Sequence, residues 1–492
     1  MRGTGGPRRY VMWLLVYELA CLLYYYVPAS SRHSTSLFGT LPFGSWQVSG
    51  VVLAPAFYVM CIALMCLPYA WLLRELSRRP EGHRDLPRMI WSAALLCATL
   101  VFLPSLLSKD LFDYMGHGRL LAAHHANPFI TPASTFPADQ FTQAMGWPGS
   151  TPLYGPAWAT ACALLALLGG GSFLGTALVF KLFFVALHLA NGWMIHHLAR
   201  LQGRDAVRPA RAAAFYLFNP LVLTQTAGDA HNDVVVLFWL LLALWLLARG
   251  DTIGSGLAGA MSVVTKYVTA PVMLLAAGHL LRSGRLRTGG MRAVLIFAGA
   301  GALVAVVAYA PYMAGFDPGH FLRPYEHSSY QGGIMMLAEM VLVRAMGEEN
   351  LPGSAVAGLL VRLSQAAALF LGIWYLRLLW RVRTVEDVVT GSTRLLLYYL
   401  LGVTALLRTS YLVWIVGTAA IVASAPLRRA VAVFSVSALS LEVFWIYKMA
   451  IEGPAPLYDL WRFAASAVAV GAPILYLLSH FKRWPWGRTQ SP

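Results

Sequence analysis

Two carboxylates, Asp110 and Asp113, open a polar stretch of the chain directly after the apolar segment 90–107. A charged side chain at a membrane boundary is costly unless it faces a cavity or a partner, so both residues are candidates for function. A carboxylate in this position can act as a general base on an attacking hydroxyl group. The alternatives are that Asp110 caps the helix that begins after Lys109, and that Asp113 is a surface residue on the same helix face.

Further polar residues stand in segments that are otherwise apolar or rich in proline and glycine. Some carry an alternative explanation: Asp229 and Asp233 can be turn or cap residues, and Arg119 can be a solvated loop residue. Lys266 lies inside the apolar stretch 253–281. A lysine there needs a partner or a route to water, and we therefore interpret Lys266 as functional. The candidates, in chain order, are Arg119, Asn127, Tyr154, Asp229, His231, Asn232, Asp233, Lys266, Arg408 and Tyr411.

Metal-binding residues are not indicated. His117, His124 and His125 fall in the same polar stretch without the spacing of a metal site. The five cysteines all lie in apolar stretches, where they are expected to be small buried hydrophobic residues rather than metal ligands or disulfide partners. We expect no metal and no other cofactor.

Composition places these residues in a membrane. The chain has 492 residues, of which 58% are hydrophobic and 12% are charged, and its mean hydropathy is +0.62. Soluble domains carry roughly 25% charged residues. Apolar stretches long enough to cross a bilayer recur throughout, which predicts an all-α polytopic protein with about 12 to 14 transmembrane helices in one integral-membrane domain, residues 1–492.

Arginine placement predicts the topology. Arginines gather in seven short loops or tails, and short basic loops stay in the cytoplasm. Both termini are then cytoplasmic, and Asp110 faces outside. The net charge of +16 is explained by the cytoplasmic leaflet, so we expect no nucleic acid partner. The basic groups lie at residues 2–9, 74–88, 200–211, 282–292, 377–394, 428–429 and 482–488.

The predicted crossings leave two long outer loops, 108–156 and 315–352. The first is expected to be the catalytic loop, and its proline and glycine residues predict a folded loop that carries short helices. The first apolar segment is expected to be a signal-anchor rather than a cleaved signal peptide. Segment 158–168 is short for a crossing, and 253–281 is interrupted by Lys266 and Pro271, so both are expected to be re-entrant or broken elements that line a cavity. The remaining crossings are predicted at 10–27, 51–73, 90–107, 173–198, 294–312, 355–376, 395–407, 411–425, 430–447 and 463–478.

An ordered set of short motifs resembles a known family. The motifs are Asn-Pro-Phe at 127–129, Thr-Pro-Leu-Tyr-Gly-Pro at 151–156, Asn-Pro-Leu at 219–221 and Gly-Asp-Ala-His-Asn-Asp at 228–233. Their order and spacing resemble the bacterial polyprenol-phosphomannose-dependent alpha-1,6-mannosyltransferases, of the GT-C class of integral-membrane glycosyltransferases. The resemblance covers roughly residues 90–280.

The resemblance implies a GT-C-like helical bundle in a bacterial plasma membrane. Its outward-facing site would take a hexose, with mannose as the family's sugar, from a polyprenyl-phosphate carrier to a glycan or glycolipid. Asp110 matches the family's loop aspartate, and Asp113 is the reserve. The chain departs from the family at Arg408–Tyr411, where Trp-Tyr is usual, and at Asp229, where a second glycine is usual.

The reaction accounts for the residue types. A sugar phosphodiester has a good leaving group, so the reaction needs one base and positive charge for the departing phosphate. We assign Asp110 as the base, and expect a single displacement that inverts the anomeric centre. Lys266, Arg408 and Arg119 are expected at the phosphate, and the sugar or acceptor would contact His231, Asn232, Asp233, Asp229, Tyr154, Asn127 and Tyr411.

Two other functions fit a polytopic protein with outer polar residues. A secondary transporter or flippase of lipid-linked sugars would also use broken helices and an intramembrane lysine, but such proteins often show internal repeats and polar groups near the bilayer midplane. The chain shows no repeat, and its acids stand at the outer boundary. A glycan ligase or polymerase would use a pyrophosphate-linked oligosaccharide as donor.

Overall fold

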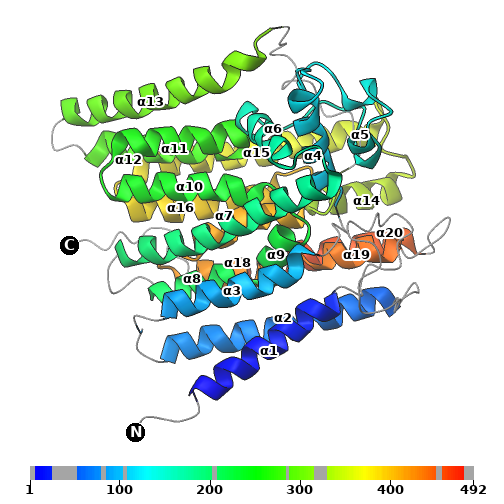
Figure 1. Ribbon diagram of the computed structural model, residues 1–492, viewed down its shortest axis with the longest axis horizontal. Coiled ribbons are helices and arrows are strands. Elements are labelled where there is room, and N and C mark those ends of the chain that lie inside the picture. The colour runs from blue at the N-terminus through cyan, green and yellow to red at the C-terminus, as the bar shows by residue number, and fades with distance from the viewer. Residues whose placement is uncertain are drawn as a thin grey trace.

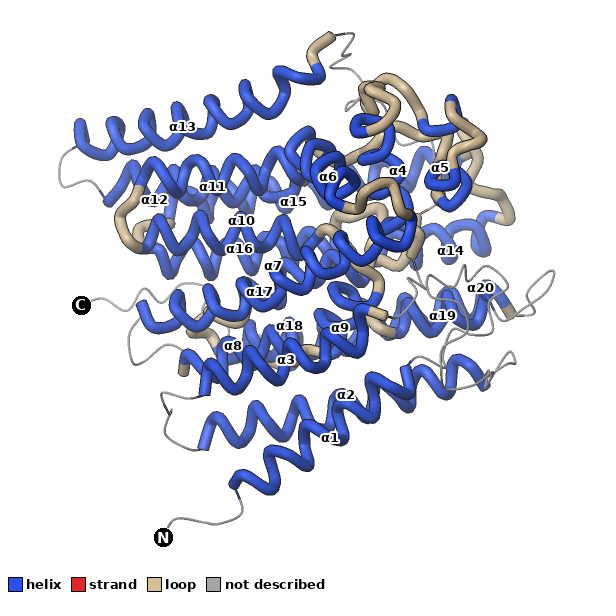
Figure 2. Tube along the Cα trace, viewed as in Figure 1, coloured by secondary structure: helices blue, strands red, loops and turns tan. Residues whose placement is uncertain are grey.

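The structure is a computed structural model that describes residues 6–24, 53–78, 82, 85–102, 108–201, 208–283, 287–314, 330–449 and 457–480. Within these ranges the chain is helical, and its one bridge between extended segments pairs Gln331 with Leu406. Figure 1 shows long helices lying side by side as a bundle, with α4, α5 and α6 gathered at one end. Figure 2 shows that most loops of the described chain are at that same end. The expected all-α polytopic class is confirmed.

Twenty helices make up the described bundle. Through α10 their bounds are α1 Gly6–Tyr24, α2 Leu53–Arg78, α3 Asp85–Val101, α4 Asp110–Ala122, α5 Gln140–Ala144, α6 Pro156–Leu168, α7 Phe173–Leu201, α8 Pro209–Leu217, α9 Pro220–Leu223 and α10 Asp233–Ala248. The others are α11 Thr252–Thr265, α12 Ala270–Ser283, α13 Arg287–Tyr309, α14 Ile334–Met346, α15 Ala355–Arg381, α16 Val385–Gly402, α17 Leu412–Ala419, α18 Ala425–Ser437, α19 Ser440–Met449 and α20 Tyr458–Ser479.

Six described spans are long and apolar enough to cross a membrane, and a bent pair at Pro220–Gly228 and Asp233–Ala248 makes up to seven. The expected count of 12 to 14 is higher because it includes helices that are shorter, interrupted or more charged. Thus α3 has 17 residues, and α1 contains Arg8, Arg9 and Glu18.

Several predicted boundaries were wrong. The basic group 377–394 was expected to be a loop, yet Arg377 lies in the last turns of α15 and Arg394 lies inside α16. Helix α16 begins early because Thr384 and Asp387 form a capping box that satisfies its first backbone N–H groups. The outer loop 315–352 contains the helix α14, and its residues 315–329 lie outside the described ranges. Residues 103–107, the end of a predicted crossing, also lie outside them.

The segment 108–156 carries the short helices α4 and α5, as expected for a folded outer loop. Asp139 caps α5 and also accepts from Arg119 Nε at 3.0 Å and contacts His124 Nε2 at 2.8 Å. Helix α4 packs closely on α6 at Gly118. A Cβ atom at this position would stand 2.3 Å from the Cys162 carbonyl oxygen, so the absence of a side chain allows the close approach. These contacts hold the C-terminal half of α4 against α5 and α6.

Two breaks in the bundle bring polar residues to the N-terminal turn of α4. Between α9 and α10 the chain forms a π-helical turn at Thr224–Gly228, and the two apolar segments meet at 115°. Between α11 and α12 the helix stops at Lys266, whose backbone is extended. This second break confirms the predicted interruption of segment 253–281. Irregular backbone at such depth is tolerated where protein or a cavity surrounds it.

Candidate active site

Asp110 is the first residue of α4, and it stands at the centre of the site. Its Oδ2 atom accepts from the hydroxyl groups of Tyr114 at 3.3 Å and Tyr154 at 3.4 Å. His231 Nδ1 lies 3.2 Å from the same oxygen. The carboxylate therefore accepts from two tyrosines and faces one histidine, and because the side chain of Asp110 remains 33% exposed it is still open to an incoming group.

The charge of Asp110 is stabilised by its neighbours. Burial by itself would raise the pKa of this carboxyl, but the hydrogen bond and charge of His231, with the charge of Arg408, hold the pKa well below its ordinary value. Opposite charges and hydrogen bonds to the ionised form both act in this direction. Asp110 is therefore an ionised carboxylate throughout the neutral range.

The turn at 228–233 brings His231 to Asp110. Asn219 begins this stretch by accepting from the backbone N–H groups of Leu221 and Val222, which starts α9 in the Asn-Pro-Leu motif. Ala230 then adopts a positive φ of 61°, a strained conformation for a residue with a Cβ atom. Strain of this kind persists where the surrounding structure requires it, and here it directs His231 toward α4.

Lys266 forms an ion pair at the broken helix. Its Nζ atom lies 2.7 Å from Asp233 Oδ1, and the two side chains are 15% and 2% exposed. The ammonium group also lies 4.3 Å from the ring centre of Tyr411 and 4.8 Å from that of Trp414. Cations are attracted to aromatic ring faces at such distances, so this position holds a positive charge well.

Tyr154 links the base to the cation. Its hydroxyl group contacts Asp110, while its ring centre lies 5.6 Å from Lys266 Nζ. Gly155 fixes this placement, because its N–H donates to the Thr265 carbonyl at 3.0 Å. A Cβ atom there would stand 2.0 Å from the Val264 carbonyl oxygen, so only glycine fits. The Tyr-Gly-Pro motif thus sets the separation between Asp110 and Lys266.

Asp113 and Asn127 support the loop. Asp113 Oδ1 accepts from the backbone N–H groups of Gly146 at 2.8 Å and Trp147 at 3.1 Å. Burial and the nearby Asp110 charge raise its pKa to about 7, against the opposing effect of those hydrogen bonds. Asn127 Nδ2 donates to the Tyr312 carbonyl at 3.1 Å. Neither residue contacts Asp110 directly.

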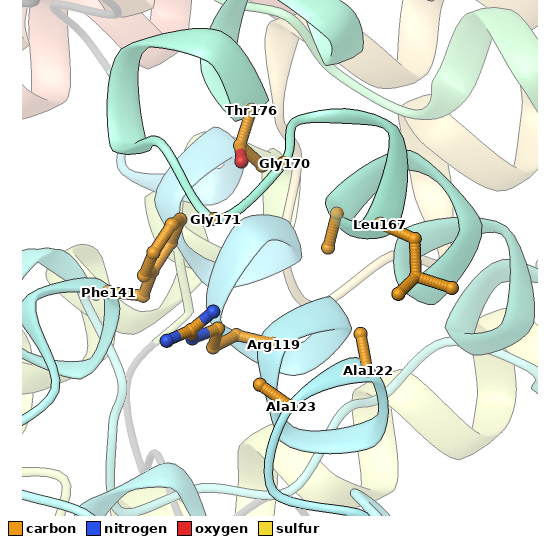
Figure 3. A pocket seen from close by; sticks show the side chains of 9 residues that line it. Arg119, Ala122, Ala123, Phe141, Leu167, Gly170, Gly171 and Thr176 are labelled. Atoms are coloured by element: carbon orange, nitrogen blue, oxygen red, sulfur yellow. The ribbon is translucent and has the colours of Figure 1, made fainter.

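Arg119 is not brought to the carboxylate. It follows Asp110 by nine residues, which is two and a half helical turns and places it on the opposite face of α4. Figure 3 shows its guanidinium group beside Phe141, 5.1 Å from the ring centre. It lines a separate cavity of about 220 Å³ between α4, α5 and the turn that joins α6 to α7.

Three predicted site residues remain, namely Arg408, Asp229 and Asn232. Arg408 precedes Tyr411, and its charge reaches Asp110. Asp229 is buried and accepts from Gln225 Nε2 at 3.4 Å. Asn232 is fully buried, and neither its Nδ2 nor its Oδ1 atom has a hydrogen-bond partner among the described residues. A buried amide of this kind indicates an absent polar ligand or water.

The sequence reasoning missed Glu442, a buried acid on α19. Its Oε1 atom lies within hydrogen-bond distance of the Thr409 hydroxyl group, and Gln225 Oε1 lies 3.1 Å from the same hydroxyl group, which can donate to one of the two oxygens at a time. The charges of Asp229, His231 and Arg408 act on it. A lone acid within an apolar helix is itself a sequence signal for function, and it could have been used here. Tyr114 and Gln225 give no comparable signal.

Metal-ligand geometry is not found in the described part of the chain, where no group of three or more His, Cys, Asp or Glu residues is placed to hold an ion. The absence of a metal requirement therefore stays a prediction. What the described side chains offer is one partly exposed carboxylate, a neighbouring histidine and two cations.

Comparison with known proteins connects this geometry to a family. Residues 17–282, more than half of the chain, match the family described as alpha-(1->6)-mannopyranosyltransferase, N-terminal domain. Alpha-(1->6)-mannopyranosyltransferase B of Corynebacterium glutamicum is 28% identical over 171 residues, which cover 33% of this chain and 27% of that protein. Alpha-(1->6)-mannopyranosyltransferase A of Mycobacterium tuberculosis is 24% identical over 277 residues, which cover 55% of this chain and 52% of that protein.

The matched part of the chain spans about half or less of the length of these curated relatives. The family match, residues 17–282, contains Asp110, His231, Asp233 and Lys266, the residues that the structure brings together. The resemblance seen in the sequence is confirmed, and the chain belongs to the alpha-(1->6)-mannopyranosyltransferase family.

Proposed function

We propose that this protein is an inverting mannosyltransferase that moves mannose from a polyprenyl-phosphate carrier to a glycan or glycolipid on the outer face of the membrane. The observation that carries the proposal is the placement of an open carboxylate at the hydroxyl group of Tyr154 and of an ammonium group over the ring of the same residue. A glycosyl phosphate needs these two functions on either side of its anomeric carbon.

Asp110 takes the proton of the acceptor hydroxyl group. A carboxylate with a low pKa is a weak base, but a weak base suffices here. As the acceptor oxygen bonds to the anomeric carbon it becomes a strong acid, and it loses its proton late in the step. Tyr114, Tyr154 and His231 keep the carboxylate ionised and oriented. No second carboxylic acid is needed for a phosphate leaving group, unlike in a glycosidase.

Lys266 receives the departing phosphate. An ammonium group has three N–H donors, so Lys266 can keep its bond to Asp233 and still donate to a phosphate oxygen. Arg408 would add a second positive charge there, since its field reaches Tyr411, whose ring faces Lys266. Cations that are already in place stabilise the negative charge that develops on the leaving phosphate in the transition state. They lower the activation free energy because the protein does not have to rearrange during the reaction.

Sugar hydroxyl groups would contact the 229–233 turn. The unpartnered amide of Asn232 supports this assignment, because a sugar hydroxyl group can both donate to and accept from it. We assign the acceptor to the side of Glu442 and Asp229, where two buried acids lie next to Thr409 and Gln225. Attack from that side, with phosphate leaving toward Lys266, inverts the configuration and makes an alpha linkage from a beta-linked donor.

The test is transfer by the purified protein from synthetic polyprenyl-phosphate mannose to a short mannoside, with a nucleotide-linked mannose as the alternative donor. We expect an alpha-linked product, identified by NMR, from the polyprenyl donor alone. Product from the nucleotide donor, or a beta-linked product, would refute the carrier or the inversion. Donor transport across vesicles without product would favour a flippase.

A further inference from the structure

Lys181 is a buried lysine to which the proposed reaction gives no part. It lies in α7, a helix long and apolar enough to cross the membrane, and its side chain is 0% exposed. A charged group in such a helix is costly unless it has a partner or a function. The Nζ atom of Lys181 donates to the carbonyl oxygen of Gly228 at 2.8 Å. The lysine is therefore directed at the π-helical turn that leads to the active site.

The carbonyl group of Gly228 needs a donor from outside its own segment. Gly228 is the last residue of the π-helical turn, and carbonyl groups at a helix end lose their partners within the helix. The chain bends by 115° between this turn and α10, so the following N–H groups do not continue the helical pattern. Lys181 supplies a donor, and a buried carbonyl group without one would be costly.

Gly228 begins the short segment that brings His231 to Asp110. The backbone N–H group of His231 donates to the Gln225 carbonyl at 3.0 Å, which ties this segment back to the π-helical turn. Ala230 lies between Gly228 and His231 and holds its strained positive φ. A shift of Gly228 is thus passed on to His231, whose Nδ1 atom lies 3.2 Å from the Asp110 carboxylate.

Helix α7 also fixes the helices on both sides of this segment. Figure 1 shows α7 running beside α10. His188 Nε2 lies 3.2 Å from the Leu217 carbonyl oxygen at the end of α8. Asn191 Nδ2 donates to the Val234 carbonyl oxygen in α10 at 3.1 Å. These contacts hold the flanking helices, whereas the bond from Lys181 reaches the turn between them.

We propose that Lys181 is a positioning residue for mannosyl transfer, which holds the 228–233 turn through the Gly228 carbonyl so that His231 faces Asp110. This role rests on the proposed function of Asp110 as the base, which His231 orients. Lys181 acts through the turn rather than on a substrate. The competing explanation is charge balance, because the charge of Asp229 in the same turn acts on Lys181.

Two variants separate the hydrogen bond from the charge. Lys181→Met removes both, and Lys181→Gln keeps an N–H donor without the charge. The matched control is His188→Phe, which removes a buried polar contact between α7 and a carbonyl group of α8. Hydrogen exchange of the backbone amides at 228–233, measured by mass spectrometry on the ligand-free full chain, reports the turn. We expect exchange about tenfold faster in Lys181→Met than in the wild type, as loss of one buried hydrogen bond implies, and near the wild-type rate in the other two variants.

The titration of His231 distinguishes positioning from charge balance. It is followed by NMR in histidine-labelled protein, with His231→Asn to assign the signal. Burial lowers the pKa of His231, but the hydrogen bond and charge of Asp110 raise it above its ordinary value. If Lys181 positions the turn, Lys181→Met separates His231 from Asp110 and this pKa falls. If Lys181 only balances charge, loss of its positive charge favours the protonated histidine and the pKa rises. The other acids that act on His231 are the same in these variants, namely Asp229, Asp233 and Glu442.

In the transfer reaction kcat should fall about tenfold in Lys181→Met and return in Lys181→Gln. If Lys181→Met does not fold, Lys181→Met with Asp229→Asn leaves no unbalanced charge. That variant is compared with Asp229→Asn alone, and the same fall in the pKa of His231 is expected.

An unchanged or raised pKa of His231 in Lys181→Met would overturn the proposal. Equally fast exchange in His188→Phe would do the same, and so would a wild-type kcat in Lys181→Met. Absence of transfer by the wild type would instead refute the proposed function, while the exchange and the titration would still decide whether Lys181 places the turn.

Discussion

Replacing Lys266 with methionine separates the two roles that the structure gives this residue. The ammonium group neutralises the buried Asp233 at 2.7 Å, and in the proposed reaction it also receives the donor phosphate. Methionine keeps a side chain of similar length without the charge. Both stability and donor use should therefore fall, for different reasons.

The stability effect follows from burial. Asp233 is 2% exposed, so loss of its partner leaves a charge that water does not reach. Removing one member of a buried ion pair costs about 3–5 kcal/mol. The donor effect follows from one charge-assisted hydrogen bond, worth about 1.5–3 kcal/mol, which corresponds to a roughly 10- to 150-fold loss in kcat/KM for the donor.

A second substitution distinguishes the two effects. Asp233→Asn combined with Lys266→Met removes both charges, and such a replacement is often nearly neutral for stability. We expect the thermal unfolding midpoint in detergent to recover while the donor kcat/KM stays low. Asp233→Asn alone, measured in parallel, shows how much of any loss belongs to that residue.

The reasoning would be refuted if the double variant regained the donor kcat/KM of the wild type. Lys266 would then only balance Asp233. It would equally be refuted if Lys266→Met altered the acceptor KM and left the donor KM unchanged, because the ammonium group would then face the other substrate.

Three further outcomes are expected. Because folding raises the pKa of Asp113 to about 7, the folded state holds its proton more tightly. The free energy of unfolding should then fall by up to about 4 kcal/mol as pH rises from 4 to 7, and Asp113→Asn should remove this slope in pH-dependent unfolding. Glu442→Gln should raise the acceptor KM about tenfold, as loss of a charged hydrogen bond predicts, and leave the donor KM unchanged; the reverse pattern would place Glu442 with the donor. Chelators should leave turnover intact, and a strict requirement for a divalent ion would contradict the metal-free reaction.

Much of the fold was predictable because hydrophobic length is a strong signal. The break at Lys266 was predictable for a different reason: a charged side chain within an apolar stretch is costly, and it is found where it has a partner or a function. Predicted helix boundaries were wrong where side-chain hydrogen bonds at the helix end determine where the helix begins. The capping box at Thr384 begins α16 well before the apolar run that was expected to define the helix.

The site was predictable in part. Asp110, His231, Asp233 and Lys266 are close together, as their assignment to one surface required. Helix geometry explains why Arg119 is not with them, and counting turns from Asp110 would have shown it. The neighbourhood of Glu442 could not be read from the sequence, because Thr409 and Gln225 meet it across long separations that only tertiary packing sets.

The central claim is that Asp110 is the base, and a matched pair of variants tests it most directly. Asp110→Asn and Asp113→Asn make the same chemical change three residues apart, and the amide oxygen introduced by Asp113→Asn can still accept from Gly146 and Trp147. Transfer of mannose from polyprenyl-phosphate mannose should be lost in Asp110→Asn and retained within a few-fold in Asp113→Asn. Near-normal turnover by a folded Asp110→Asn protein would contradict the account.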